Sequence, residues 1–325
     1  MRGFEYYKPK TVKEAIELMV SLENAKFIAG GTDIMVLIRQ KKISPQSVVS
    51  LRNIPELAEI DTKDGLRIGS CVTHNDIDKN EYIKKYYSAL TDATSQLGSR
   101  QIRNVATIGG NICNAAPSAD TACPLLVLDA KAVIIGQDSS REVDLDEFFL
   151  GPGKTVLSRG EILKEFIMPR FNENTGSSYI KHTRREAMDL PILGVATRIT
   201  ISITSGNEVR CRDMFCTIDS ISNILERLKD EGLRCEDVRI AMGVVAPRPI
   251  RAKKAEAALK GKIVTPELFE EIGEIAASEA QPRDSVRGEA WYRREMIKVL
   301  VKRSLAKSMD RVIRPDEAIY PERLW

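Results

Sequence analysis

Apolar residues recur at helical spacing close to the start of the chain, and short strand-like runs follow them. Thr11 and Glu14 form a capping box ahead of apolar residues that share one helix face, which predicts a helix over 12–22. Runs rich in β-branched residues predict strands at 26–29, 48–51, 66–68, 107–108, 132–135 and 161–168. Helices are expected at 34–38, from Thr73 onward, at 82–97 and at 145–149.

The second half of the chain mixes longer strands with longer amphipathic helices. Strands are expected at 195–203 and 239–245, a hairpin turn at 205–207 leads to Val209, and helices are expected at 218–228 and 266–279. A last helix over 288–309 carries basic residues on one face, which indicates a solvated face or, less commonly, a partner surface: Arg293, Arg294, Lys298, Lys302 and Arg303. A linker near Pro55 and the polar run 172–178 suggest division points. We expect an α+β protein with regions 1–55, 56–172 and 173–325.

The composition is that of a globular protein without a strong charge field. Of 325 residues, 43% are hydrophobic and 29% are charged, and 49 basic against 46 acidic residues leave a net charge of +3. That balance argues against nucleic-acid binding. No apolar run approaches the roughly 20 residues of a membrane span, and the N-terminus lacks the apolar core of a secretion signal. A cytoplasmic protein is therefore expected.

Cysteines and histidines form no metal-binding pattern in the sequence. The six cysteines are scattered without a C-x-x-C pair, and the two histidines are His74 and His182. Reduced thiols and no metal bound by this chain are expected. His74 lies at the expected helix start, which indicates a surface or capping histidine.

Two double glycines, each after a short β-like run, supply the main candidate chemistry. They lie in Gly30-Gly31-Thr32-Asp33 and in Gly109-Gly110-Asn111. Glycine lets the backbone approach a ligand, and N–H groups at a helix start favour an anion, so the two turns together predict a diphosphate cradle. Either turn could instead be purely structural, with Asp33 acting only as a helix N-cap. Polar groups follow the second turn at Asn114, Ser118 and Asp120.

Two better-known phosphate motifs are excluded. The three glycines of G-x-G-x-x-G serve one loop, whereas these turns stand about 75 residues apart. The segment 151–155 is similar to the end of a P-loop, but Phe148 stands where the first glycine is needed and Pro152 removes a backbone donor. A dinucleotide would therefore be held by another fold.

Several strings resemble one family in the order in which that family carries them. They are AGGTDIMVLIR at 29–39, RNVATIGGNI at 103–112, the segments 117–120 and 151–155, and GVVAPRPIRAKKAE at 243–256. They are similar to the FAD-binding medium subunit of the molybdenum hydroxylases, which include xanthine dehydrogenase, carbon monoxide dehydrogenase and the 4-hydroxybenzoyl-CoA reductases. The resemblance covers nearly the whole chain. It implies an FAD-binding fold of the vanillyl-alcohol-oxidase (PCMH) type, with two α/β subdomains and a C-terminal α+β domain.

The same resemblance implies the cofactor contacts. The first loop would wrap the diphosphate and ribitol with Lys26, Phe27, Ile28, Ala29, Gly30, Gly31, Thr32, Asp33 and Ile34. The second loop would hold the diphosphate with Ala106, Thr107, Gly109, Gly110 and Asn111. Ser118 and Asp120 match positions near the adenosine end, Leu163 matches an apolar contact, and Lys181 matches a lysine that approaches the flavin. Residue type alone indicates a core leucine and a surface lysine for the last two. Cys113 is a further candidate contact, although it and Cys123 are expected to be structural thiols.

Two departures from the family pattern are visible. Some members carry an aromatic residue beside the flavin, near the position of Asp189. This chain has Leu190-Pro191 at that place, and the difference affects how the flavin ring packs. The 4-hydroxybenzoyl-CoA reductase branch carries a cysteine-rich insertion for a [4Fe–4S] cluster after the TIGGN motif, and here Asn111 continues directly to Asp120. The chain therefore resembles the plain flavin subunit.

The resemblance implies an oxidoreductase subunit that transfers electrons. A molybdopterin-binding large subunit would hydroxylate the substrate, and a small subunit with [2Fe–2S] clusters would pass electrons to FAD on this chain. FAD would deliver them to a terminal acceptor, for which NAD is a candidate, within a heterotrimer. Two alternatives stay open: a stand-alone flavin reductase of the same fold, and a non-catalytic assembly module whose glycine turns are structural.

Overall fold

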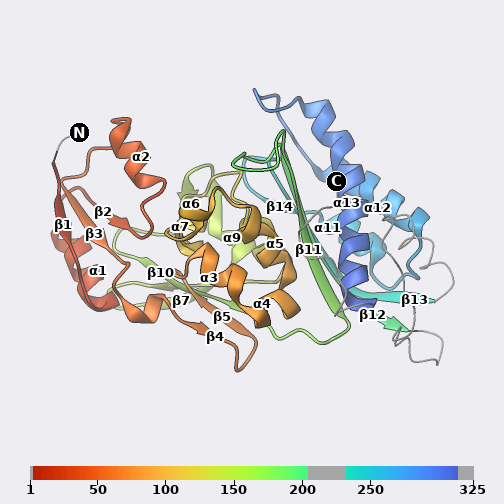
Figure 1. Ribbon diagram of the computed structural model, residues 1–325, viewed down its shortest axis with the longest axis horizontal. Helices are drawn as coiled ribbons and strands as arrows, with labels where there is room; N and C mark the ends of the chain where they lie inside the picture. Colours follow the sequence, from red (N-terminus) through yellow and green to blue (C-terminus); the bar gives the residue numbers. More distant parts are fainter. Residues whose placement is uncertain (1–2, 204–231, 314–325) are drawn as a thin grey trace.

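The N-terminal region is a small parallel sheet of three strands in the order β1-β3-β2 (Figure 1). The structure is a computed structural model, and it describes residues 3–203 and 232–313. The elements are β1 (Glu5–Tyr7), α1 (Val12–Ser21), β2 (Ala25–Ile28), α2 (Ile34–Arg39), β3 (Ser47–Ser50) and the 3-10 helix η1 (Pro55–Leu57). Thr11 caps α1, whose buried residues pack with Val49 of β3. Both predicted helices, at 12–22 and 34–38, and both predicted strands, at 26–29 and 48–51, are confirmed.

The middle region is a five-stranded antiparallel sheet in the order β4-β5-β10-β6-β7, covered by short helices. Its strands are β4 (Ile60–Asp61), β5 (Leu66–Gly69), β6 (Lys131–Ile135), β7 (Ser140–Asp144) and β10 (Ile162–Met168), with a hairpin of β8 (Phe149–Gly151) and β9 (Lys154–Thr155). Its helices are α3 (His74–Lys79), α4 (Glu81–Tyr86), α5 (Ser88–Gln96), α6 (Arg100–Arg103), α7 (Ile108–Cys113), α8 (Ala122–Val127) and α9 (Leu145–Phe148).

The helix predicted over 82–97 is two helices, α4 and α5. Tyr87 leaves helical geometry between them, because its side chain is fully buried and its hydroxyl donates to the carbonyl oxygen of Pro169 at 2.8 Å. The segment 151–155 forms the β8–β9 hairpin, as expected of a surface turn.

The C-terminal region is an antiparallel sheet in the order β11-β12-β13-β14 with long helices. Its elements are β11 (Thr175–His182), β12 (Leu193–Ile203), β13 (Leu233–Gly243), β14 (Ile250–Arg251), α11 (Lys253–Leu259), α12 (Pro266–Glu279) and α13 (Ala290–Ile313). The strand predicted at 239–245 begins earlier, and the helix predicted at 266–279 is confirmed. The predictions at 205–207, Val209 and 218–228 lie outside the described residues.

The C-terminal sheet takes part in two cores. Figure 1 shows α11, α12 and α13 on one side of it and the helices of the middle region on the other. Along β11, Tyr179 belongs to the core of the middle region, whereas Ile180 belongs to the core of the C-terminal helices. This is the two-residue alternation of a strand between two packed layers. The boundaries near 55 and 172 stay predictions, since the packing crosses the second of them.

The basic face predicted for the last helix is wrong at its first residue. Arg293 is 2% exposed, and its guanidinium donates to the carbonyl oxygen of Ile192 at 3.0 Å, to the hydroxyl of Ser285 at 2.7 Å and to the carbonyl oxygen of Arg283. A buried arginine is tolerated because such acceptors replace water. Arg293 therefore ties α13 to the residue before β12.

Asp92 on α5 joins the middle region to α13. Its carboxylate is fully buried and accepts two hydrogen bonds of 2.8 Å from the Arg311 guanidinium and one of 3.2 Å from Lys307. The backbone N–H of Tyr179 donates to it at 2.9 Å. Burial opposes ionisation, but the charges of Arg311 and Lys307 hold the pKa of Asp92 below its usual value. This buried ionic cluster thus connects α5, β11 and α13.

The stability of the protein should depend on pH through Lys307. Burial lowers the pKa of Lys307 to about 8, whereas an unfolded lysine keeps its proton to about pH 10.4. Between these values the unfolded chain binds more protons, so this residue makes the free energy of unfolding rise with pH. Urea titrations of the wild-type and Lys307→Met proteins from pH 7 to pH 10 should show the wild type gaining stability relative to the variant. A constant difference would contradict the assignment.

Candidate FAD-binding site

The two glycine motifs lie against each other. A Cβ atom on Gly30 would stand 2.0 Å from the carbonyl oxygen of Val105 and 2.8 Å from the Cα atom of Ala106. Figure 1 shows α2, which follows the first motif, on the side of its region that faces α6 and α7. Glycine at position 30 is required because the backbone of the second motif passes where a side chain would start. The motifs therefore converge, as the diphosphate-cradle hypothesis requires.

The first loop presents free backbone donors. Gly31 has a φ of +78°, and its carbonyl oxygen accepts from Met35 to start α2 at 3.1 Å. Among the described residues, the N–H groups of Thr32, Asp33 and Ile34 donate to no carbonyl oxygen, as expected for the first turn of a helix. Asp33 occupies the N-cap position but its exposed side chain makes no capping hydrogen bond, so its predicted capping role is wrong. The donors remain available to an anion.

The second motif starts a helix, so the strand predicted at 107–108 is wrong. Thr107 alone is extended, and its Oγ1 atom caps α7 by accepting from Gly110 N–H at 3.1 Å. Ile108 and Gly109 donate to the carbonyl oxygens of Val72 and Ser70 at 3.0 and 2.9 Å. These N–H groups are already bonded inside the protein, so they are not free to donate to an anion. The second loop can only leave room for one.

The two glycines of the second motif differ in what they do. A Cβ atom on Gly109 would stand 2.4 Å from the Cβ atom of Ser70, so internal packing requires glycine there. A Cβ atom on Gly110 would meet only the Thr107 Oγ1 atom, at 3.0 Å, so internal packing leaves this side of the turn open. The open side at Gly110 and the free donors of the first loop fit a diphosphate.

Asn111 connects the cradle to a buried ion pair. Its Oδ1 atom accepts from the Thr121 hydroxyl at 2.7 Å, and the neighbouring Asp120 is 5% exposed. The Lys181 ammonium donates to the Oδ2 atom of Asp120 at 2.9 Å, and the Tyr179 hydroxyl donates to its Oδ1 atom at 3.0 Å. Lys181 is 6% exposed, so residue type gave the wrong prediction of a surface lysine.

The ion pair constrains how the cofactor contacts are distributed. The resemblance matches Asp120 to the adenosine end of FAD and Lys181 to the flavin end. Their side chains touch, so the two positions cannot lie at opposite ends of an extended dinucleotide as the resemblance alone would place them. Burial raises the pKa of Asp120, while the charge of Lys181 and the hydroxyl of Tyr179 act in the opposite direction.

The other candidate residues differ in how far they are buried. Leu163 lies in the core of the middle region, where its residue type placed it. Phe27 is packed against the core cluster that contains the buried face of α1, and Lys26 is exposed on β2. Cys113 is half-buried, and burial raises its pKa to about 12, which keeps the thiol protonated. Ser118 is half-buried.

His74 lies directly behind the second motif. It is fully buried, so the predicted surface or capping role of its side chain is wrong, and its backbone N–H donates to the Ala106 carbonyl oxygen at 3.1 Å. Burial and the nearby Arg103 lower the pKa of His74 to about 4, so the ring is neutral at physiological pH. Its position in Thr-His-Asn-Asp signalled a helix start but not burial.

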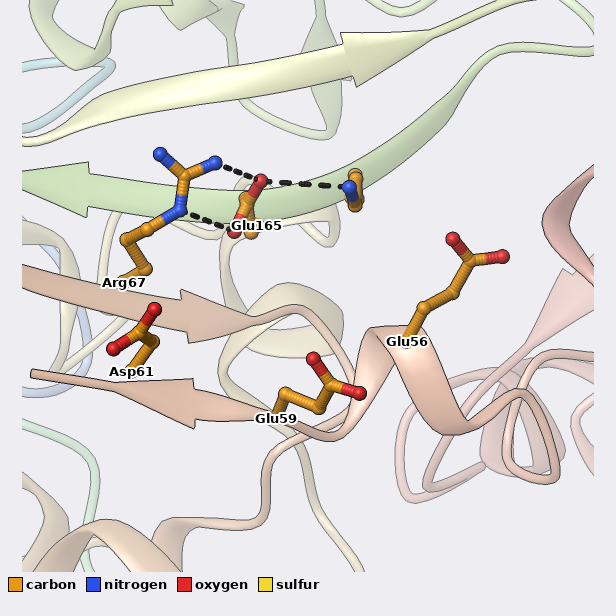
Figure 2. Close-up of a pocket in the computed structure, with 6 residues that line it drawn as sticks. Glu56, Glu59, Asp61, Arg67 and Glu165 are labelled. Atoms are coloured by element: carbon orange, nitrogen blue, oxygen red, sulfur yellow. Dashed lines mark hydrogen bonds and ion pairs between the residues drawn. The ribbon is translucent and has the colours of Figure 1, made fainter. Parts of the chain in front are cut away.

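A polar pocket on the sheet of the middle region is a poor rival site for a dinucleotide. It is lined by Glu56, Glu59, Asp61, Arg67, Lys164 and Glu165. Figure 2 shows Arg67 turned to Glu165, with an Nη2–Oε1 distance of 2.6 Å, and three further carboxylates nearby. Four acids against two cations disfavour a polyanion.

The described residues contain no group of three or more His, Cys, Asp or Glu placed to hold a metal. None of their helices has both the length and the apolar character of a membrane span.

Two converging loops and a buried carboxylate–lysine pair fit an FAD-binding subunit of an oxidoreductase, and the comparisons with known proteins show that class. Residues 2–171 match the family described as the FAD binding domain in molybdopterin dehydrogenase, and residues 178–308 match the CO dehydrogenase flavoprotein C-terminal domain. The chain belongs to this family of molybdenum hydroxylase flavoprotein subunits. The family, the fold class and the FAD cofactor that the sequence predicts are confirmed.

Known proteins resemble the chain over nearly its full length. It is 33% identical to the xanthine dehydrogenase FAD-binding subunit of Escherichia coli O157:H7, over 94% of this chain and 95% of that protein. It is 29% identical to the carbon monoxide dehydrogenase medium chain of Hydrogenophaga pseudoflava, over 93% and 96% of the two chains. A solved structure of carbon monoxide dehydrogenase from the same organism superimposes with a TM-score of 0.82 at 30% identity, covering 95% of this chain and 98% of that one.

Proposed function

We propose that this chain binds FAD across its two glycine loops and passes electrons from an iron–sulfur partner to a terminal acceptor. The observation that carries the proposal is the close approach of Gly30 to Val105, which joins free helix donors on one loop to an open glycine on the other. Free donors occur at any helix start, but here they lie beside a second loop that internal packing leaves open at Gly110. The chain would thus supply position and electrostatics, while bound FAD supplies the redox chemistry.

Each loop has a distinct part in this proposal. The N–H groups of Thr32, Asp33 and Ile34 bind diphosphate oxygens at the start of α2, where the helix dipole also favours negative charge. Gly110 lets the diphosphate approach the second loop. Asp120 and Lys181 form one buried ion pair, which Asn111 and Thr121 join to the cradle. We put this pair at the flavin end, where the resemblance places Lys181, rather than at the adenosine end, where it places Asp120.

The complex around the chain is also part of the proposal. Relatives are named FAD-binding subunit and medium chain of xanthine and carbon monoxide dehydrogenases. By that relationship this chain assembles with a molybdopterin-binding large subunit and a [2Fe–2S] small subunit as a cytoplasmic heterotrimer, with NAD as a candidate acceptor. Co-expression of the three subunits tests this. FAD in the purified complex should be reduced when the substrate of the large subunit is added, and should stay oxidised when the small subunit is omitted.

Replacing Gly110 with valine should remove FAD without unfolding the chain. The Cβ atom of the added side chain would meet only the Thr107 hydroxyl, and the side chain would occupy the open side of the loop, so FAD affinity should fall at least about tenfold. Flavin absorbance per chain and titration of the apoprotein with FAD measure the loss.

Gly3→Val is the matched control, because nothing lies within 4 Å of a Cβ atom there. Unchanged flavin content in Gly110→Val would favour the alternative of an assembly module with structural glycine turns. A variant that lost FAD and also unfolded would show that Gly110 serves packing, against the geometry described above.

A further inference from the structure

The Tyr179 hydroxyl holds one oxygen of Asp120 while Lys181 holds the other. The hydroxyl donates to Oδ1 at 3.0 Å and the ammonium donates to Oδ2 at 2.9 Å, so the carboxylate is fixed from both sides. Tyr179 and Lys181 are two residues apart on β11 and therefore point to the same face of the strand. All three side chains are at least nine-tenths buried.

The neighbouring strands leave space for this hydroxyl. Gly194 on β12 pairs with Lys181 across the sheet, and a Cβ atom on Gly194 would stand 2.5 Å from the Tyr179 hydroxyl oxygen. The next residue in that row is Gly243 on β13, where a Cβ atom would stand 3.1 Å from the Cys123 sulfur of α8. Two glycines in register thus admit both the tyrosine and the helix that follows Asp120.

The backbone of Tyr179 is held independently of its side chain. Its N–H group donates to Asp92 at 2.9 Å, within the ionic cluster that joins α5 to α13. Burial and the Asp120 charge raise the pKa of Tyr179 well above its usual value, so the hydroxyl stays protonated and can only donate to this carboxylate. Removing the hydroxyl would therefore release Asp120 without moving the strand.

We infer that Tyr179 is a positioning residue, whose hydroxyl orients Asp120 so that the Lys181 ammonium is held at one fixed place beside the flavin. The inference rests on the proposed function, which puts Lys181 at the flavin end of FAD. A fixed positive charge favours electron density on a flavin, and its effect depends on its position. The ammonium also donates to the carbonyl oxygen of Gln96, but at the longer distance of 3.3 Å. Loss of the tyrosine hydroxyl would let the carboxylate turn and would shift the ammonium with it.

The test compares Tyr179→Phe with Asp120→Asn and Lys181→Met. Each is purified with FAD, and the midpoint potential and absorption spectrum of the flavin are measured, together with FAD affinity of the apoprotein. Tyr179→Phe should shift the potential by less than Asp120→Asn, because it leaves the carboxylate charge in place, and should weaken FAD binding by about twofold to tenfold. Tyr87→Phe is the matched control, since it removes another buried tyrosine hydroxyl, bonded to Pro169, far from this cluster in the chain.

The outcomes separate the inference from the proposed function. If Asp120→Asn and Lys181→Met shift the potential and Tyr179→Phe does not, the positioning role is wrong and the site assignment stands. If none of the three changes potential, spectrum or affinity, the placement of Lys181 beside the flavin is wrong. If Tyr179→Phe only lowers stability, as Tyr87→Phe should, the tyrosine is structural. If Tyr179→Phe does not retain FAD, the ultraviolet tyrosine absorption of the wild-type and Asp120→Asn apoproteins is compared instead. A difference between the two spectra would show that the Tyr179 and Asp120 side chains interact.

Discussion

Replacing Asp92 with alanine should lower the free energy of unfolding by about 3–5 kcal/mol, the cost of breaking a buried ion pair on one side. The change leaves the Lys307 ammonium buried without its carboxylate and removes both Asp92 bonds of the Arg311 guanidinium. It also removes the acceptor of the Tyr179 N–H group, so β11 loses one attachment to the middle region. Urea denaturation at neutral pH measures the change.

The Asp92 effect should also appear in the pH dependence. The pKa of Asp92 is lowered in the folded protein, so its contribution to stability is fully present above about pH 4, the usual value for an unfolded aspartate. It is lost as the pH falls through the lower folded value. The wild type should therefore lose its advantage over Asp92→Ala in acid.

An exposed ion pair provides the comparison for Asp92. Glu81 pairs with Lys84 at 2.7 Å on α4, and its side chain is 83% exposed. Glu81→Ala should change the free energy of unfolding by less than about 1 kcal/mol, because water screens such a pair. Equal effects of the two substitutions would mean that the Asp92 cluster does not join the two regions as the contacts indicate.

Local pattern predicted much of the fold but not the start of α7. The residues Thr107 and Ile108 are β-branched, and Gly109 and Gly110 are poor helix formers, so local preference favours a strand and a turn. In the structure the Thr107 hydroxyl caps a helix, and bonds from Ile108 and Gly109 to the 70–72 segment fix its first turn. Those partners lie far away in the sequence, so tertiary contacts overrode local propensity.

The convergence of the two glycine motifs was predictable, whereas the ion pair beside them was not. Each double glycine follows a strand-like run, and a dinucleotide needs both a donor loop and an open backbone, so the sequence indicated that they meet. Lys181 stands on a strand among polar neighbours and looks exposed by residue type. Its partner Asp120 is 61 positions away, and only the packing of β11 against α8 brings them together.

Replacing Gly30 with alanine should weaken both the fold and FAD binding. A Cβ atom there would lie 2.0 Å from the Val105 carbonyl oxygen, which belongs to the backbone and cannot turn away as a side chain would. The two loops would have to separate, at a cost of about 1–3 kcal/mol for overpacking. FAD affinity should fall at least about tenfold, since the donors of the first loop and the open side of the second would no longer face one ligand.

Gly110→Ala separates these two effects, because its Cβ atom would meet only the Thr107 hydroxyl, at 3.0 Å. Urea denaturation of the two apoproteins should therefore show a large loss of stability for Gly30→Ala and a small one for Gly110→Ala, whereas titration with FAD should show weaker binding in both. Wild-type stability and affinity in Gly30→Ala would mean that the loops do not touch. Reduced stability with normal affinity would mean that they touch but do not share a cofactor, because a cradle built from both loops cannot lose their contact and keep its ligand.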